Sequence, residues 1–243
     1  MPPRDGRVLS EDTTERSIVS KLHQDLIDPK NKSLWLKKAS KFVNLANKGF
    51  REIYKDWWGS ETPPDLEVDL VLVFEDMNKL VDDALIVGVE VEYIEDRTKN
   101  FYIGLDQVLS FALFGFDGFA LWHVFSPKAS GLVNSYRRAL RETARLHRLS
   151  IHYVTLQETP EVPLKYCEDY ITPYEISASR LAEMTRLYFT GENSYRRLPL
   201  HKLNLPRTLV RRPEDQMEAD MFRATEACKK RRGTLKTMLR IPV

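Results

Sequence analysis

Three acidic residues stand on two neighbouring apolar segments, where a charge needs a partner. Asp69 lies at the start of the segment Val68 to Phe74, and Glu90 and Glu92 lie within Ala84 to Ile94. Two-residue alternation along a strand puts Glu90 and Glu92 on one face. If the two segments pair as a hairpin, Asp69 approaches Glu90, and Mg²⁺ or Mn²⁺ bound by these oxygens would relieve the repulsion among them. The alternative interpretation is an ordinary solvated strand face.

Carboxylates that hold a divalent ion are suited to hydrolytic phosphoryl chemistry. Such an ion polarises a phosphodiester, generates hydroxide from bound water and offsets charge on the leaving oxygen. The five histidines show no ligand spacing such as HxxxH, and the chain has neither GxSxG nor a phosphate-binding glycine loop, so zinc chemistry and serine-type hydrolysis are poor fits. His123 is expected to be a hydrogen-bonded sheet histidine, which reaches substrate only if it faces the side of Glu90.

The elements that must position these residues follow from apolar periodicity. Segments rich in Val, Ile and aromatic residues predict four strands, at Val68–Phe74, Ala84–Ile94, Phe119–Phe125 and Ile151–Gln157. Apolar residues at helical spacing predict helices at Glu11–Ile27, Ser33–Trp58, Phe101–Phe114, Gly131–Leu149 and Ala178–Phe189. Gly115 is the expected C-cap of the helix from Phe101. The mixture of helices and strands predicts an α/β fold.

The chain of 243 residues divides into an N-terminal helical segment, residues 1–32, an α/β core, residues 33–158, and a helical C-terminal extension, residues 159–243. From residue 196 onward the extension has 13 Lys or Arg against 5 Asp or Glu, a net +8, whereas the rest of the chain is −6. An anionic partner such as nucleic acid could bind there, and the candidate residues are Arg211, Arg212, Lys229, Lys230, Arg231 and Arg232. Alternatively, these bases end a last helix before Gly233, where the helix dipole favours them.

Nothing in the composition indicates a membrane protein. No apolar run approaches the ~20 residues that span a bilayer, and Met1 to Ser10 lacks the apolar centre of a signal peptide. Cys167 and Cys228 lie far apart without CxxC spacing, so we expect neither a cysteine metal site nor a disulfide framework. An intracellular, cytoplasmic location with no membrane partner is the expectation.

The order of these features resembles the PD-(D/E)XK nuclease superfamily. Asp69 comes first, Glu90-Val91-Glu92 follows after a hairpin, and then come a helix with Gln107 and the strand from Phe119. The resemblance covers about Ser33 to Glu158. It implies a restriction endonuclease-like core with a mixed central sheet of about four strands flanked by helices. It also implies that Asp69 and Glu90 are metal ligands and that Gln107 has the family's helix position, although a buried, hydrogen-bonded amide is the alternative.

Two positions need separate treatment within this resemblance. Glu52, on the expected helix before the first strand, matches an additional acid, or is an exposed helical glutamate. Glu92 stands where the family usually has a Lys that positions the attacking water and stabilises developing charge. Some restriction enzymes of this fold carry Glu there and remain metal-dependent nucleases, and Arg97 or Lys99 could supply a migrated cation.

The resemblance therefore implies two alternative functions. The first is a Mg²⁺- or Mn²⁺-dependent hydrolase of the endonuclease or exodeoxyribonuclease type, in which Asp69, Glu90, Glu92 and Gln107 are the catalytic residues and all three acids can bind metal. The second is an inactive protein of nuclease fold that binds nucleic acid or serves as an assembly subunit. The expected partner is nucleic acid, with DNA favoured over RNA, and the resemblance suggests a homodimer.

Overall fold

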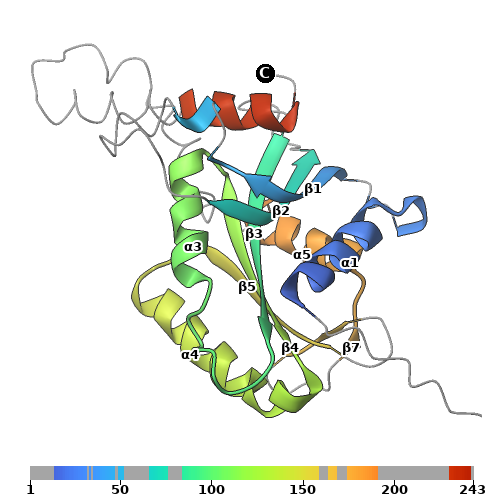
Figure 1. The fold of residues 1–243 in the computed structure, drawn as a ribbon, viewed down its shortest axis with the longest axis vertical. Helices are drawn as coiled ribbons and strands as arrows, with labels where there is room; N and C mark the ends of the chain where they lie inside the picture. The colour runs from blue at the N-terminus through green and yellow to red at the C-terminus, as the bar shows by residue number, and fades with distance from the viewer. Residues whose placement is uncertain are drawn as a thin grey trace, which may run out of the picture.

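A mixed sheet of seven strands lies at the centre of the structure, and the strands are neighbours in chain order (Figure 1). The computed structural model describes residues 14–31, 33, 35–46, 49–51, 66–75, 84–158, 164–168, 174–190 and 230–241. The strands are β1 Leu36–Asn44, β2 Glu67–Glu75, β3 Ala84–Ile94, β4 Gly118–Phe125, β5 Ile151–Gln157, β6 Lys165–Tyr166 and β7 Tyr174–Glu175. Strands β3, β4 and β5 run parallel to one another, and every other neighbouring pair is antiparallel.

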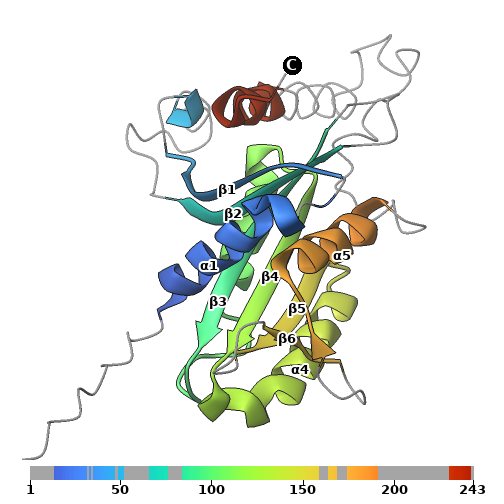
Figure 2. The same ribbon diagram turned by 90° about the vertical axis from the view of Figure 1, so that its right-hand side faces the viewer.

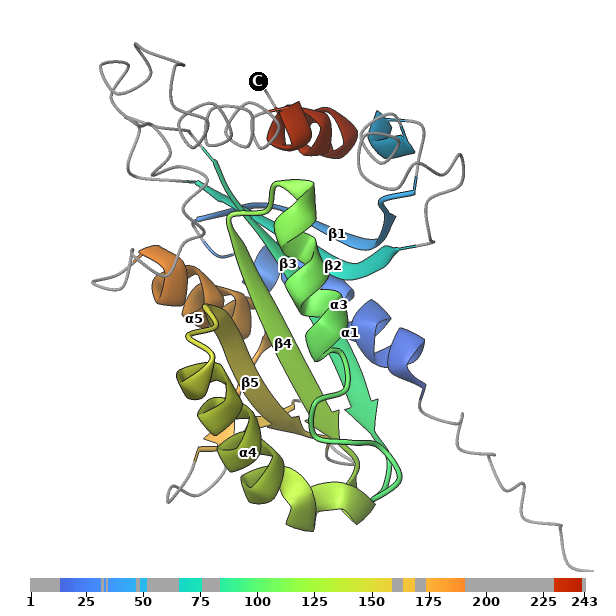
Figure 3. The same ribbon diagram turned by 90° about the vertical axis from the view of Figure 1, so that its left-hand side faces the viewer.

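Helices cover both faces of this sheet. They are α1 Glu15–Ile27, α3 Leu105–Ser110, α4 Val133–Leu146 and α5 Ala178–Thr190, with 3-10 turns η1 Pro29–Asn31, η2 Phe111–Phe114 and η3 Pro127–Leu132 and a C-terminal helix over residues 230–239. Figure 2 shows α1 and α5 on one face, and Figure 3 shows α3 and α4 on the other. The α/β class is confirmed. None of the helices in this described part of the chain is long and apolar enough to cross a membrane.

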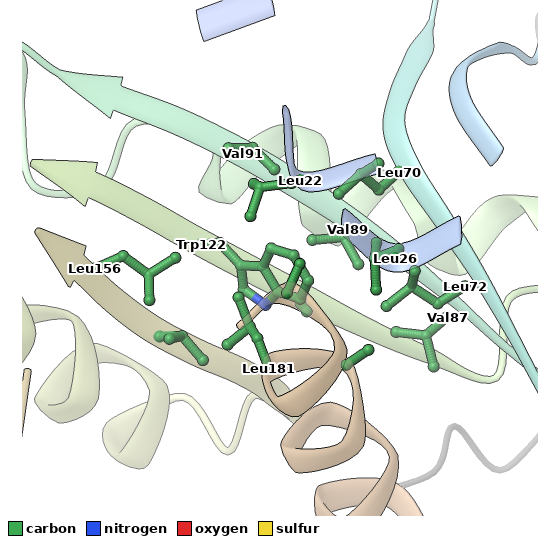
Figure 4. Close-up of a cluster of buried hydrophobic side chains, with 14 of the residues drawn as sticks. Leu22, Leu26, Leu70, Leu72, Val87, Val89, Val91, Trp122, Leu156 and Leu181 are labelled. Carbon is green, nitrogen blue, oxygen red and sulfur yellow. The ribbon is translucent and has the colours of Figure 1, made fainter. Parts of the chain in front are cut away.

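Each face of the sheet has its own apolar core, which explains why β3 and β4 have nearly continuous apolar sequences. Against α1 and α5, the indole of Trp122 lies among aliphatic side chains from the strands and helices, including Leu22, Val89 and Leu181 (Figure 4). Against α3, α4 and the C-terminal helix, the core contains Leu121 with the residues Val71, Phe111, Leu140 and Leu235. The acidic residues of β2 and β3 interrupt this second core.

The four predicted strands correspond to β2, β3, β4 and β5, but the helix predicted from Ser33 to Trp58 is wrong over β1. Residues Leu36–Asn44 pair with β2 instead. The register shifts between Leu36 and Lys38, and Phe42 has a positive φ of 51°. These irregularities break the two-residue alternation, so the apolar positions imitate a helical period. The sheet also has seven strands instead of about four because β1, β6 and β7 extend it. Glu52, the additional acid of the resemblance, and Trp58, the predicted end of this helix, lie outside the described residues.

The end predicted for the last helix before Gly233 is also wrong, because residues 230–239 are all helical. Leu235 and Leu239 are one turn apart and both are buried in the core beside α3 and α4. This burial outweighs the cost of glycine in a helix, about 1 kcal/mol. Gly115, the predicted C-cap, does end η2 in the left-handed region, with φ of 82°, and a Cβ there would lie 2.7 Å from the Cα of Arg232.

A buried ion pair holds the C-terminal helix against the sheet. Arg232 Nη1 lies 2.7 Å from Asp117 Oδ2, and their side chains are 11% and 1% exposed. The same Asp117 oxygen accepts a 2.7 Å hydrogen bond from the backbone N–H of Ile86. Arg232 also donates through Nη2 to the carbonyl oxygen of Ala84, at 2.9 Å. The guanidinium therefore joins the start of β3 to the segment that precedes β4.

We predict that Arg232→Gln lowers the free energy of unfolding by about 3 kcal/mol, because it leaves the buried Asp117 carboxylate without this guanidinium. Urea unfolding followed by circular dichroism measures the change. Lys230→Gln is the control: it is an exposed position in the same helix and should shift stability by less than about 0.5 kcal/mol. Equal stability of the two variants would contradict a structural role for the pair.

Candidate functional site

The β2–β3 hairpin brings the acid of one strand to the acids of the next. Leu70 pairs with Val89 in the antiparallel register, so Asp69 stands opposite Glu90 one position further along. Asp69 Oδ2 accepts a 2.9 Å hydrogen bond from the backbone N–H of Val91. Alternation puts Glu92 on the same face as Glu90. The hairpin expected from the sequence is thus present, and it gathers the three acids on the face that α3 covers.

Glu90 is the most deeply buried of these acids. The residue is 5% exposed, and its Oε2 atom has no hydrogen-bond partner within the described residues. Burial, together with smaller contributions from the nearby Asp69 and Glu92 carboxyls, raises the pKa of Glu90 to about 10. Without a cation, the carboxyl is therefore protonated at neutral pH. A hard cation would supply the missing partner for this oxygen.

Asp69 and Glu92 have pKa values that lie near neutrality. The pKa of Asp69 is raised to about 7, mainly by burial and also by the Glu15 and Glu92 carboxyls. The hydrogen bond from the Val91 N–H acts in the opposite direction. The pKa of Glu92 is also raised to about 7, because burial and the Glu15 carboxyl raise it more than Lys99 lowers it. Both carboxyls consequently change charge in the range where a cell or an assay buffer operates.

Lys99 brings a positive charge to this acidic group from the loop that follows β3. Its Nζ lies 3.1 Å from Glu92 Oε2 and 3.4 Å from Glu15 Oε2. Burial alone would lower the pKa of Lys99, but Glu92 and Glu15 outweigh it and raise that pKa. Its carbonyl oxygen accepts a hydrogen bond from the Tyr136 hydroxyl of α4, which fixes the loop. Of the two cations suggested for this role, Lys99 touches the acids and Arg97 is exposed.

Glu15 is a member of the group that the sequence alone did not reveal. It occupies the first turn of α1, directly after Thr14, whose hydroxyl caps the helix by accepting from Ser17 N–H. Glu15 Oε2 accepts from the backbone N–H of Tyr93 at 3.3 Å, beyond the point where β2 pairs with β3. Its only sequence signal is an acid in a first helical turn, which the helix dipole explains equally well.

Gln107 and His123 have hydrogen-bonding roles at the edge of the site. Gln107 Nε2 donates to the carbonyl oxygen of Glu67 at 2.8 Å, which ties α3 to β2. His123 pairs in register with Glu92 across β3 and β4, but its ring nitrogens lie 3.1 Å from Ile103 O and 3.0 Å from the Tyr153 hydroxyl. Burial lowers the pKa of His123 to about 4, so the ring is neutral. The prediction of a hydrogen-bonded sheet histidine is confirmed.

The residues that could hold a divalent cation are Asp69, Glu90 and Glu92, with Glu15 beside them. Their oxygen atoms fit Mg²⁺ or Mn²⁺, and the buried Glu90 Oε2 has no competing hydrogen bond among the residues described. Over the ranges described, however, no three His, Cys, Asp or Glu side chains are already arranged as a metal site. Asp69 Oδ2 is turned toward Val91 N–H. A shared ion therefore requires these carboxyl groups to turn toward it.

The basic residues proposed as a nucleic-acid contact do not form a single described surface. Arg211, Arg212 and Lys229 lie outside the described residues. Lys230 is exposed and Arg231 is half-buried. Arg232 is engaged by Asp117, so its guanidinium has a structural role within the fold.

Comparisons with protein-family models, with curated proteins and with solved structures give no significant match. The function is therefore argued from the geometry and chemistry of this site.

We predict that the metal-free protein loses stability as the pH rises. An acid whose pKa is higher in the folded state retains its proton there when the unfolded chain has released it, so stability falls between the two pKa values. That interval runs from about 4 to about 7 for Asp69 and Glu92, and to about 10 for Glu90. Glu90→Gln removes the largest contribution and should stabilise the protein by about 2 kcal/mol or more at pH 8.

Urea unfolding between pH 5 and pH 9 in the presence of a chelator tests this expectation. The matched control is Glu175→Gln, an exposed carboxyl in β7, which should leave the pH profile of the wild type unchanged. A Glu90→Gln variant that is less stable than the wild type at pH 8 would show that Glu90 is ionised and paired in the folded protein.

Proposed function

We propose that the protein is a metal-dependent nuclease-like hydrolase that cleaves phosphodiester bonds in nucleic acid, with Asp69 and Glu90 as ligands of Mg²⁺ or Mn²⁺. The observation that carries the proposal is the buried Glu90 carboxyl, whose Oε2 has no hydrogen-bond partner within the described residues and which stands opposite Asp69. A structural role alone does not account for three carboxyls on one buried face, since apolar side chains would pack there without the electrostatic cost. A bound cation supplies the compensating charge.

The order of elements supports the same proposal. The acids lie on the β2–β3 hairpin, α3 with Gln107 follows, and β4 then runs parallel to β3. This is the succession on which the resemblance to the PD-(D/E)XK superfamily rests. Within that proposal, DNA is the substrate and two copies of the chain act together, as the resemblance implies.

Each residue of the site has a distinct part in the proposed hydrolysis. A bound divalent ion supplies Lewis acidity toward the phosphodiester. Asp69 and Glu90 hold that ion, and Glu92, whose pKa lies near 7, accepts a proton from the attacking water or completes the ligand set. Lys99 keeps a positive charge beside Glu92 and is placed to stabilise negative charge that develops on the phosphate. Lys99 would thus replace the Lys that the family usually has at the position of Glu92.

A binding function without cleavage is the second candidate. It is favoured by Glu92 at the position of the family's usual Lys and by the lack of a preformed three-ligand site in the described ranges. In that case the acidic group would have no catalytic role, and the protein would bind nucleic acid or assemble with other subunits. Metal binding and cleavage separate the two candidates.

The metal proposal predicts that Asp69→Asn and Glu90→Gln abolish Mn²⁺ and Mg²⁺ binding measured by calorimetry at pH 7.5. The same variants should cut single- or double-stranded DNA at least about 10²-fold more slowly, because the ion and its electrostatic stabilisation are lost. Glu175→Gln should bind metal and cleave like the wild type. Metal affinity that survives both substitutions would refute the ligand assignment, and metal binding without cleavage by the wild type would favour the second candidate.

Lys99→Met is predicted to reduce the turnover of cleavage by about 10²-fold while the metal affinity stays within a few-fold of the wild type. Lys99→Arg keeps the charge and should recover part of the rate. Arg97→Met, two residues away on the same loop, is the control and should be as active as the wild type. Loss of turnover in the Arg97 variant alone would assign the cationic role to Arg97 instead.

A further inference from the structure

An arginine-rich stripe on α4 is a charged surface that the proposed site does not use. The stretch 128–148 contains six Lys or Arg against a single acid, Glu142. Arg138, Arg141 and Arg145 are exposed at helical spacing, and Arg148 is exposed in the turn that follows. Successive positions of this kind lie within one side of a helix. We call these four arginines the α4 basic stripe.

The other arginine of this helix has an internal role, which separates it from the stripe. Arg137 is 3% exposed and donates to the carbonyl oxygen of Cys167. Within the stripe, Arg145 binds the one acid, with Nε 3.0 Å from Glu142 Oε2. The side of α4 that packs on the sheet carries Val133, Tyr136 and Leu140. The apolar side of the helix is therefore turned to the sheet, and its exposed side is polar and cationic apart from Leu146 at its end.

The α4 basic stripe belongs to the same side of the molecule as the acidic site. Helices α3 and α4 cover one face of the sheet, as Figure 3 shows. Glu90 pairs in register with Leu121, which belongs to the core on that face, so strand alternation puts Glu90 and Glu92 on the same face. The Tyr136 hydroxyl of α4 donates to the carbonyl oxygen of Lys99. A polyanion approaching a group of carboxylates is repelled unless positive charge nearby holds it. The stripe adds positive charge to the side of the molecule on which α3 and α4 lie.

We propose that the α4 basic stripe binds the phosphate backbone of the nucleic acid whose cleavage is proposed above, and this inference rests on that function for its partner. The guanidinium group forms paired hydrogen bonds with phosphate oxygens, which suits a surface made of Arg. From Arg138 to Arg145 the helix rises about 10 Å, which equals the rise along the duplex axis over roughly three phosphates of one strand. The contacts are to the backbone, so binding does not depend on base sequence.

The test uses the full chain and a 20-base-pair DNA duplex, with binding followed by fluorescence anisotropy in EDTA at several salt concentrations so that no cleavage occurs. The variant is Arg138→Gln/Arg148→Gln. The control is Lys21→Gln/Arg180→Gln, which removes the same charge from exposed positions on α1 and α5, across the sheet. The stripe variant should bind at least tenfold more weakly, and the slope of log K against log salt should fall by roughly 0.9 per lost contact. The control should bind like the wild type.

The outcomes separate this inference from the proposed hydrolysis. If DNA binding is weakened equally in the stripe and control variants, or in neither, the inference is overturned and the stripe is only a solvated helix face. This conclusion holds whatever the metal titration gives. Lost DNA binding in the stripe variant alone supports it even if the wild type binds no metal. Binding of the wild type to anionic phospholipid vesicles but not to DNA would overturn it in favour of a membrane surface. Circular dichroism and thermal unfolding confirm that both double variants are folded.

Discussion

The burial of carboxyl groups on one face of the β2–β3 hairpin is the constraint around which the neighbouring elements are arranged. Removing a carboxylate from water is costly, and the cost is reduced either by protonation or by a compensating cation. Glu90 bears most of this desolvation cost, because the residue is 5% exposed and its Oε2 has no hydrogen-bond partner in the described structure. A protein that kept this face only for stability would place an apolar side chain there, as it does at Leu121 in the neighbouring strand.

Three elements that are remote in sequence meet at this acidic group, and each is fixed by contacts outside the acids themselves. Helix α1 places Glu15 through a capped first turn, and α3 is joined to β2 through the Gln107 amide. The loop with Lys99 is held by Tyr136 of α4. The ion pair between Lys99 and Glu92 therefore depends on packing as well as on charge. Such support by surrounding contacts is what a preorganised site requires.

The central sheet and part of the site can be predicted from the sequence, and what makes an element predictable differs from one element to the next. Strands β2 to β5 are predictable because they are buried on both faces, and alternation puts Glu90 and Glu92 together. Strand β1 is not, because a register shift and the positive φ of Phe42 disrupt its pattern. Glu15 and the exact partner of Lys99 depend on tertiary contacts that join residues up to 84 positions apart. Local apolar periodicity cannot predict contacts between residues so far apart in sequence.

The hydrogen bond from Arg232 to the carbonyl of Ala84 links residues 148 positions apart. Strand β3, which carries Glu90 and Glu92, therefore has its first residue secured by a segment that emerges from the ribosome long after the strand itself. Contacts of such high sequence separation require the closure of a large loop, and they slow folding. The acidic face would thus be completed late, and until then its carboxyls remain open to water, where their charge carries little penalty.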